Sequence, residues 1–118
     1  MIETKFEKLV DKILTECRLC LVKKGNEYSS QVDRFANFKR QASVLSIPKE
    51  RILQVYLAKH LDSIETYLKT MLHSGVVEAN KNLSEPISGR FVDVINYYLL
   101  LYAMIDEAQE VNNEEPIN

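Results

Sequence analysis

A nearly uninterrupted apolar run at residues 91–105 is the feature that most constrains the fold of this chain. Within this run only Asp93 and Asn96 are neither apolar nor aromatic. A helix that is hydrophobic on nearly every side must be buried, so we expect this segment at the centre of the protein. Because Asp93 and Asn96 are three residues apart, and Arg90 precedes Asp93 by three, the three side chains share one face of the helix.

The carboxylate of Asp93 is expensive to bury in such a helix. An unpaired charge in an apolar core either costs several kcal/mol or is neutralised by a change in protonation. Asp93 therefore needs a cation, a metal ion or backbone donors as its partner. The sequence leaves these three possibilities open.

Length and composition indicate one globular, helix-rich domain. The chain has 118 residues, of which 46% are hydrophobic, with only three Gly and three Pro. We expect a single helical domain over residues 1–111 and a flexible tail over residues 112–118. The net charge of -2 does not supply the basic face that binding to duplex nucleic acid requires.

The termini and the apolar run favour a protein of the cytoplasm without a membrane partner. The first residues lack the basic-then-apolar order of a secretion signal. The apolar run is shorter than the roughly 20 residues that cross a bilayer, and it contains Asp93.

Apolar residues at steps of three and four predict two helices in the first part of the chain. The first covers residues 4–23 and ends at Gly25, with its charged side in solvent. A shorter second helix directs apolar side chains inward, and these are Val32, Phe35, Phe38 and Ala42.

Two further helices are predicted in the second part. Ser46 and Pro48 are typical of a helix start, and this third helix runs to about residue 72. Residues 73–86 are expected to form a polar loop, after which Ser84 or Ser88 could cap the fourth helix.

These patterns predict an all-α bundle of about four helices: two long, one short, and one buried and apolar. Each helix of more than 20 residues is longer than about 30 Å, and its apolar surface exceeds what one small monomer covers. We therefore expect a homo-oligomer, in which a partner covers the face formed by Tyr97, Tyr98, Leu101 and Tyr102.

Cys17 and Cys20 form a CxxC pair inside the first predicted helix. A zinc site would need a second pair, which the sequence lacks, and a thioredoxin-like site would need a preceding strand. Two buried or half-buried thiols are the preferred interpretation.

Acids and bases are mixed among the polar residues beside the apolar helices. Acids suit Mg²⁺ and bases suit phosphate, so the mixture fits a phosphorylated small molecule. Aromatic rings available for stacking on a flat ligand are Tyr28, Phe35, Phe38 and Tyr97. In the alternative, structural interpretation, Asp93 pairs with Lys59 or Arg90, and Asn96 bonds across the bundle to fix helix register. No His-containing metal motif, P-loop or nucleophile motif is present.

Four short segments together resemble the nucleotide modification associated domain type 1 family, a set of small helical proteins of phages and prophages. The segments are Lys24-Gly25-Asn26-Glu27-Tyr28, Asp33-Arg34-Phe35-Ala36-Asn37-Phe38, Lys59-His60-Leu61-Asp62-Ser63-Ile64, and Glu85-Pro86-Ile87 with the following Gly89 to Tyr97. The resemblance covers about residues 20–105. It implies a link to phage nucleotide metabolism or modification.

The last helix is more distantly similar to that of the all-α MazG-like nucleoside triphosphate pyrophosphohydrolases. These proteins hold Mg²⁺ with an ExxE pair and an ExxD pair. Asp93 matches the final acid of that pattern, but Arg90 stands in place of the preceding Glu, and Lys59 and Asp62 occupy the spacing of the other pair. Bases in these positions favour direct phosphate binding.

The first hypothesis is a protein that binds a nucleotide, or a nucleotide-like phosphate ligand. Phosphate would be bound by Arg34, Lys59 and Arg90. Lys24, in the first of the four segments that resemble the family, would also bind the ligand. The base would be read by Tyr28, Asn37, Asn96 or Tyr97. The acids Glu27, Asp62 and Asp93 would orient the basic side chains that meet phosphate, or would hold Mg²⁺. If the protein is an enzyme, Asp62 and Asp93 would be catalytic in Mg²⁺-assisted hydrolysis of a phosphoanhydride.

Two alternatives remain beside this hypothesis. One is a non-catalytic protein that sequesters a nucleotide, such as a defence signal directed against phage. The other is a helical interaction module whose polar residues fix its assembly.

Overall fold

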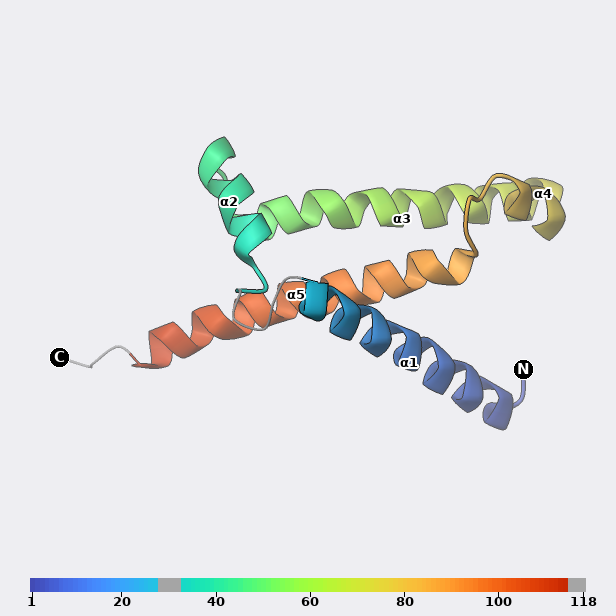
Figure 1. Cartoon of the computed structure of the whole chain (residues 1–118). Coiled ribbons are helices and arrows are strands. Elements are labelled where there is room, and N and C mark those ends of the chain that lie inside the picture. Colours follow the sequence, from blue (N-terminus) through green and yellow to red (C-terminus); the bar gives the residue numbers. More distant parts are fainter. Residues whose placement is uncertain (28–32, 115–118) are drawn as a thin grey trace.

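The computed structural model describes the backbone of residues 1–27 and 33–114 and the side chains of residues 1–23 and 33–111. The described residues form five α-helices and no strand, which confirms the predicted all-α class (Figure 1). The helices are α1 (Glu3–Glu27), α2 (Ala36–Leu45), α3 (Lys49–Ser74), α4 (Val76–Lys81) and α5 (Ile87–Glu114). None of them is long and apolar enough to cross a membrane.

The two longest helices form the frame of the molecule. α3 and α5 run antiparallel beside each other, and the short α4 lies where the chain turns back between them (Figure 1). α2 lies across the beginning of α3. α1 meets α5 near its own C-terminal end and diverges from it toward the N-terminus (Figure 1).

The buried core lies where α2 crosses α3 and the second half of α5. Its members are Phe35, Phe38, Ile52, Leu53 and Met104, and the half-buried residues packed against it are Ala42, Tyr56, Tyr97, Leu100 and Leu101. The predicted inward direction of Phe35, Phe38 and Ala42 is confirmed, while Val32 lies outside the described residues. Phe35 is buried although it precedes α2, because the Asp33 carboxylate accepts a 2.9 Å hydrogen bond from the Phe35 N–H and holds this turn.

Several predicted helix ends are wrong. α1 continues through Gly25 to Glu27, since one glycine lowers helix stability without ending a helix that is otherwise favourable. Ser46 does not begin α3 but ends α2: it adopts a left-handed conformation (φ 57°, ψ 40°), and its N–H bonds to the Ala42 carbonyl. Pro48 comes directly before α3.

The predicted polar loop at residues 73–86 is also wrong in part, because it contains α4. Gly75 has a φ of 94°, a value that suits glycine, and it separates α3 from α4. α5 begins at Ile87, so Ser88 lies inside its first turn. α5 extends to Glu114, and the division into a domain over residues 1–111 and a tail over residues 112–118 stays a prediction.

The expectation that α5 is buried on all sides is wrong for the single chain. Tyr97, Leu100 and Met104 face the core, but the opposite side of the helix is exposed. Large apolar side chains on that side are Phe91, Tyr98, Tyr102 and Ile105. Apolar composition predicts that a surface will be covered, but it does not say whether the same chain covers it.

Leu53 provides a test of the core. Its side chain is fully buried, so Leu53→Ala leaves a cavity, and we expect a loss of about 2 to 5 kcal/mol in the free energy of unfolding. Urea denaturation followed by circular dichroism measures this loss. Val55→Ala is the matched control on the same helix, because Val55 is 57% exposed and its truncation should change stability by less than about 0.5 kcal/mol. Equal effects of the two substitutions would contradict the described core.

Candidate functional site

The polar contact between α3 and α5 is made by His60 and Asp93. Nδ1 of His60 is 3.4 Å from Oδ2 of Asp93, and the two side chains are 21% and 25% exposed. The contact is an ion pair when the imidazole is protonated. The partner of Asp93 is therefore His60, rather than Lys59 or Arg90, which the sequence suggested.

A row of rings continues from this contact toward the core. The Tyr97 ring lies 5.2 Å from the His60 ring and 6.4 Å from the Tyr56 ring, measured between centroids, and both contacts are stacked. Tyr56 also meets the edge of Phe38 at 5.9 Å and donates a 2.9 Å hydrogen bond to Gln41. The Tyr97 ring thus contacts two rings of α3, and a flat ligand would have to compete with them.

Cations lie at two points along the contact between α3 and α5, which we call the seam. The Lys59 ammonium is 5.8 Å from the centroid of the Tyr56 ring, on the side of α3 next to the row of rings. At the other end, Nη1 of Arg90 is 2.9 Å from Oε1 of Glu85, in the segment before α5. Nε of Arg90 is buried and has no hydrogen-bond partner among the described residues. We call His60, Asp93, Tyr97, Lys59 and Arg90 the seam cluster.

Asn96 faces α1 rather than the seam. Its Nδ2 donates a 3.2 Å hydrogen bond to the carbonyl oxygen of Cys17, and the residue is 5% exposed. Its Oδ1 has no partner within the described part of the chain. This bond joins helices that are distant in sequence, as the structural interpretation of Asn96 predicts.

The structure does not bring Asp62 and Asp93 together. Asp62 follows His60 by two residues, which turns its side chain by about 200° around α3 and away from α5. Asp62 is exposed. Among residues whose side chains are described, no group of three or more His, Cys, Asp or Glu is placed to hold a metal ion. The side chain of Glu27, the third predicted ligand, lies outside the described part, so the Mg²⁺ site stays a prediction.

The remaining predicted residues lie elsewhere or outside the described part. Nη1 of Arg34 donates a 3.2 Å hydrogen bond to the carbonyl of Leu21 in α1. Oδ1 of Asn37 accepts hydrogen bonds from Arg40 and Gln41, at 3.2 and 3.3 Å, on the exposed side of α2. Lys24 and Glu27 have undescribed side chains, and Tyr28 lies wholly outside the described residues.

His60 is the residue that sequence reasoning did not place in the site. A usable signal exists, since His60 follows Leu53 by seven residues and Tyr56 by four, which puts it on the face of α3 that carries the core. Lys59 precedes it by one residue and so points about 100° away.

The two thiols match the preferred interpretation of the CxxC pair. Both cysteines are free; Cys17 is buried and Cys20 is half-buried. Burial raises the pKa of the Cys17 thiol, and the nearby Cys20 and Glu16 raise it further. Cys17 therefore remains protonated and poorly nucleophilic at neutral pH.

Thiol reactivity tests this difference. In the folded protein we expect a thiol reagent such as Ellman's reagent to modify Cys20 first and Cys17 much more slowly, because Cys17 is both buried and protonated. A Cys20→Ser variant isolates the slow site, and urea should make both sites react rapidly. Burial also makes the stability depend on pH. Because the pKa of Cys17 is higher in the folded than in the unfolded chain, the free energy of unfolding is unaffected below the unfolded pKa and falls as the pH rises from there through the folded pKa. Fast modification of Cys17 in the folded protein would contradict the assigned packing of α1 on α5.

Comparison with known proteins adds no neighbour: no protein-family model, curated protein or solved structure matches the chain.

Proposed function

We propose that the chain binds a nucleotide, or a similar phosphorylated small molecule, at the seam cluster between α3 and α5, with Arg90 as the phosphate-binding residue. The guanidinium group matches the geometry of phosphate oxygens and keeps its charge at any physiological pH. The choice of a nucleotide rests on the family resemblance of the four sequence segments described above.

The observation that carries the proposal is the incomplete pairing of Arg90. One guanidinium nitrogen contacts Glu85, while the buried Nε lacks a partner among the described residues. A buried donor without a partner is unusual in a folded protein and calls for a physical reason. A phosphate group that replaced Glu85 and drew the guanidinium toward it would provide one.

Glu85 is a replaceable partner. Its side chain is 49% exposed and belongs to the segment before α5, so its carboxylate can turn into water. Ion pairs of this exposure contribute only about 0 to 1 kcal/mol. A phosphate with a larger charge and more acceptor oxygens would form stronger hydrogen bonds with the guanidinium than this carboxylate does.

Other members of the seam cluster would assist at the same face. Arg90, Asp93 and Tyr97 follow one another at steps of three and four along α5, so they lie on one side of it. His60 can add positive charge when protonated. Lys59 points about 100° away from His60 around α3, so it only flanks this face, where its ammonium lies 5.8 Å from the centroid of the Tyr56 ring. Tyr97 could stack on a base if a ligand displaced one of its two ring neighbours.

Binding without turnover is favoured over hydrolysis. Asp62 points away from the seam, which leaves Asp93 as the one predicted catalytic acid there, and that acid is engaged with His60. A metal-assisted attack on a phosphoanhydride would need more carboxylates than the described seam provides. The favoured role is thus a protein that holds its ligand intact, which includes sequestration of a nucleotide signal.

A second candidate is a helical interaction module without a small ligand. It is favoured by the mutual pairing of the polar groups: His60 contacts Asp93, Arg90 contacts Glu85, and Asn96 bonds to α1. In this case the same groups fix the relative positions of the helices.

Two substitutions with opposite expected effects test the proposal. Thermal shift and calorimetry against nucleoside mono-, di- and triphosphates and cyclic nucleotides, with Mg²⁺ or EDTA, identify the ligand. At 100 times its dissociation constant, a ligand adds about 2.7 kcal/mol to stability and so raises the Tm. Arg90→Gln should weaken binding at least about tenfold through loss of a charge-assisted contact. Glu85→Gln should strengthen binding, because it removes the competing carboxylate.

Arg51→Gln is the matched control, since Arg51 is exposed and bonds to Gln54 within α3. It should bind as the wild type does. Unchanged binding by Arg90→Gln would show that phosphate is held elsewhere. No shift with any nucleotide would favour the interaction module, and a new product formed only with Mg²⁺ would restore the hydrolase hypothesis.

A further inference from the structure

Two apolar stripes of the chain remain uncovered. The outer stripe of α5 is formed by Phe91, Tyr98, Tyr102 and Ile105, which are 45% to 68% exposed. The α1 stripe is formed by Ile2, Phe6, Leu9 and Leu14, which are 50% to 72% exposed. Single exposed apolar residues are normal, but large apolar side chains that adjoin one another along a helix mark an interaction surface.

The outer stripe of α5 lies opposite the part of the helix that contacts α3. At about 100° per residue, its four members fall within a narrow arc, roughly half a turn from Asp93 and Met104. Asp93 contacts His60 of α3, and Met104 belongs to the core. α3 therefore cannot cover the outer stripe, and a helix packed against it must come from another source.

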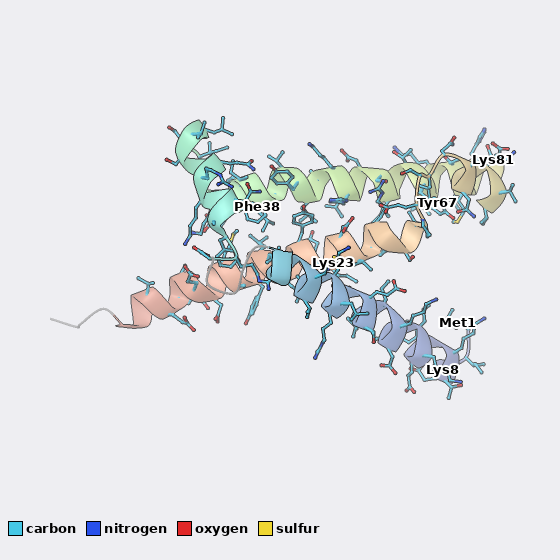
Figure 2. All side chains as sticks on the ribbon, in the orientation of Figure 1. Met1, Lys8, Lys23, Phe38, Tyr67 and Lys81 are labelled. Atoms are coloured by element: carbon cyan, nitrogen blue, oxygen red, sulfur yellow. The ribbon has the colours of Figure 1, made fainter. Side chains whose placement is uncertain are left out.

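The α1 stripe continues a contact that the chain begins. Cys17 is buried and its carbonyl accepts the Asn96 hydrogen bond, which places the C-terminal half of α1 on α5. Phe6, Val10, Ile13 and Cys17 follow one another at steps of four, three and four, and Leu9 precedes Ile13 by four. Phe6 and Leu9 therefore lie on the same face of α1 as Cys17. The N-terminal half of α1, around Met1 and Lys8, extends away from the other helices (Figure 2). The apolar face of α1 therefore extends past the part that α5 covers, and its N-terminal half has no covering helix in the described chain.

The surface area indicates the size of the missing contact. The chain exposes 9142 Å², whereas a compact protein of 13.7 kDa exposes about 6,600 Å². Its radius of gyration is 17.9 Å, compared with about 13.5 Å for a compact domain of this length. The excess of roughly 2,500 Å² per chain is at the upper end of what each chain contributes to a large homodimer interface, in which the two chains together bury about 2,000 to 5,000 Å².

We propose that a second copy of this chain covers both stripes, so that the folded unit in solution is a homo-oligomer with α1 and α5 at its interface. Every copy carries both stripes, and a two-fold arrangement would bury them in equivalent contacts. The stripe members are apolar or aromatic and uncharged, which is the composition of the central part of homodimer interfaces.

Size-exclusion chromatography with light scattering on the purified full chain tests this proposal. The wild type should have a mass of at least twice 13.7 kDa at micromolar concentration. Tyr102→Glu and Phe6→Glu should each weaken the assembly at least about tenfold, because each places a charge in a dry contact. Both positions are more than half exposed in the single chain, so neither substitution should prevent its folding. Circular dichroism verifies helicity.

Val44→Glu is the matched control. Val44 is apolar and 77% exposed but lies on α2, outside both stripes, so this variant should keep the wild-type mass. A wild-type mass of one chain at every concentration would overturn the proposal and would indicate a different protein as the occupant. Dissociation by Val44→Glu, with no effect of Tyr102→Glu or Phe6→Glu, would also overturn it. A dilution series of the wild type requires no variant and decides the matter if a substitution causes unfolding.

Discussion

The antiparallel contact between α3 and α5 is the interaction on which the rest of the structure depends. Leu53 and Met104 meet in its apolar part, and α2 closes that part from above with Phe38. α1 is attached to the other flank of α5 through Asn96 and Cys17. α5 therefore joins α1 to α3, while α3 connects α5 to α2 and α4.

The charged groups Arg90 and Asp93 of the largely apolar α5 are tolerated because each has a partner near the contact with α3. Arg90 contacts the oppositely charged Glu85, and Asp93 contacts His60, which carries a positive charge when it is protonated. Such pairs fix the rotation and register of helices, and this alone would account for them. The proposed phosphate ligand rests on the incomplete pairing of the charged Arg90, whereas the equally unpartnered Oδ1 of the uncharged Asn96 belongs to the contact with α1.

Sequence alone predicted the class of the fold and much of its core, but not the pairing of side chains. Periodicity located α1, α2, α3 and α5, but not the short α4, and it gave the inward direction of Phe35 and Phe38, because burial follows local spacing. The partner of Asp93 depends on the rotation of α3, which a difference of one residue changes by about 100°; the sequence suggests Lys59 or Arg90, whereas the structure places His60 there. The separation of Asp62 from Asp93 has the same origin. The hydrophobicity of α5 predicts that its surface is covered, but composition cannot identify the molecule that covers it, and one side of the helix is exposed in the single chain.

The proposed homo-oligomer has a second copy of the chain covering both the outer stripe of α5 and the α1 stripe. Hydrogen exchange of the wild-type backbone, measured by mass spectrometry over a range of protein concentrations, tests this most directly. The account predicts that protection of residues 3–12 in α1 rises with concentration, since a second copy covers that segment, while protection of residues 52–57 in α3 stays constant. Protection of residues 3–12 that does not change with concentration, from a chain that remains a monomer, would contradict it.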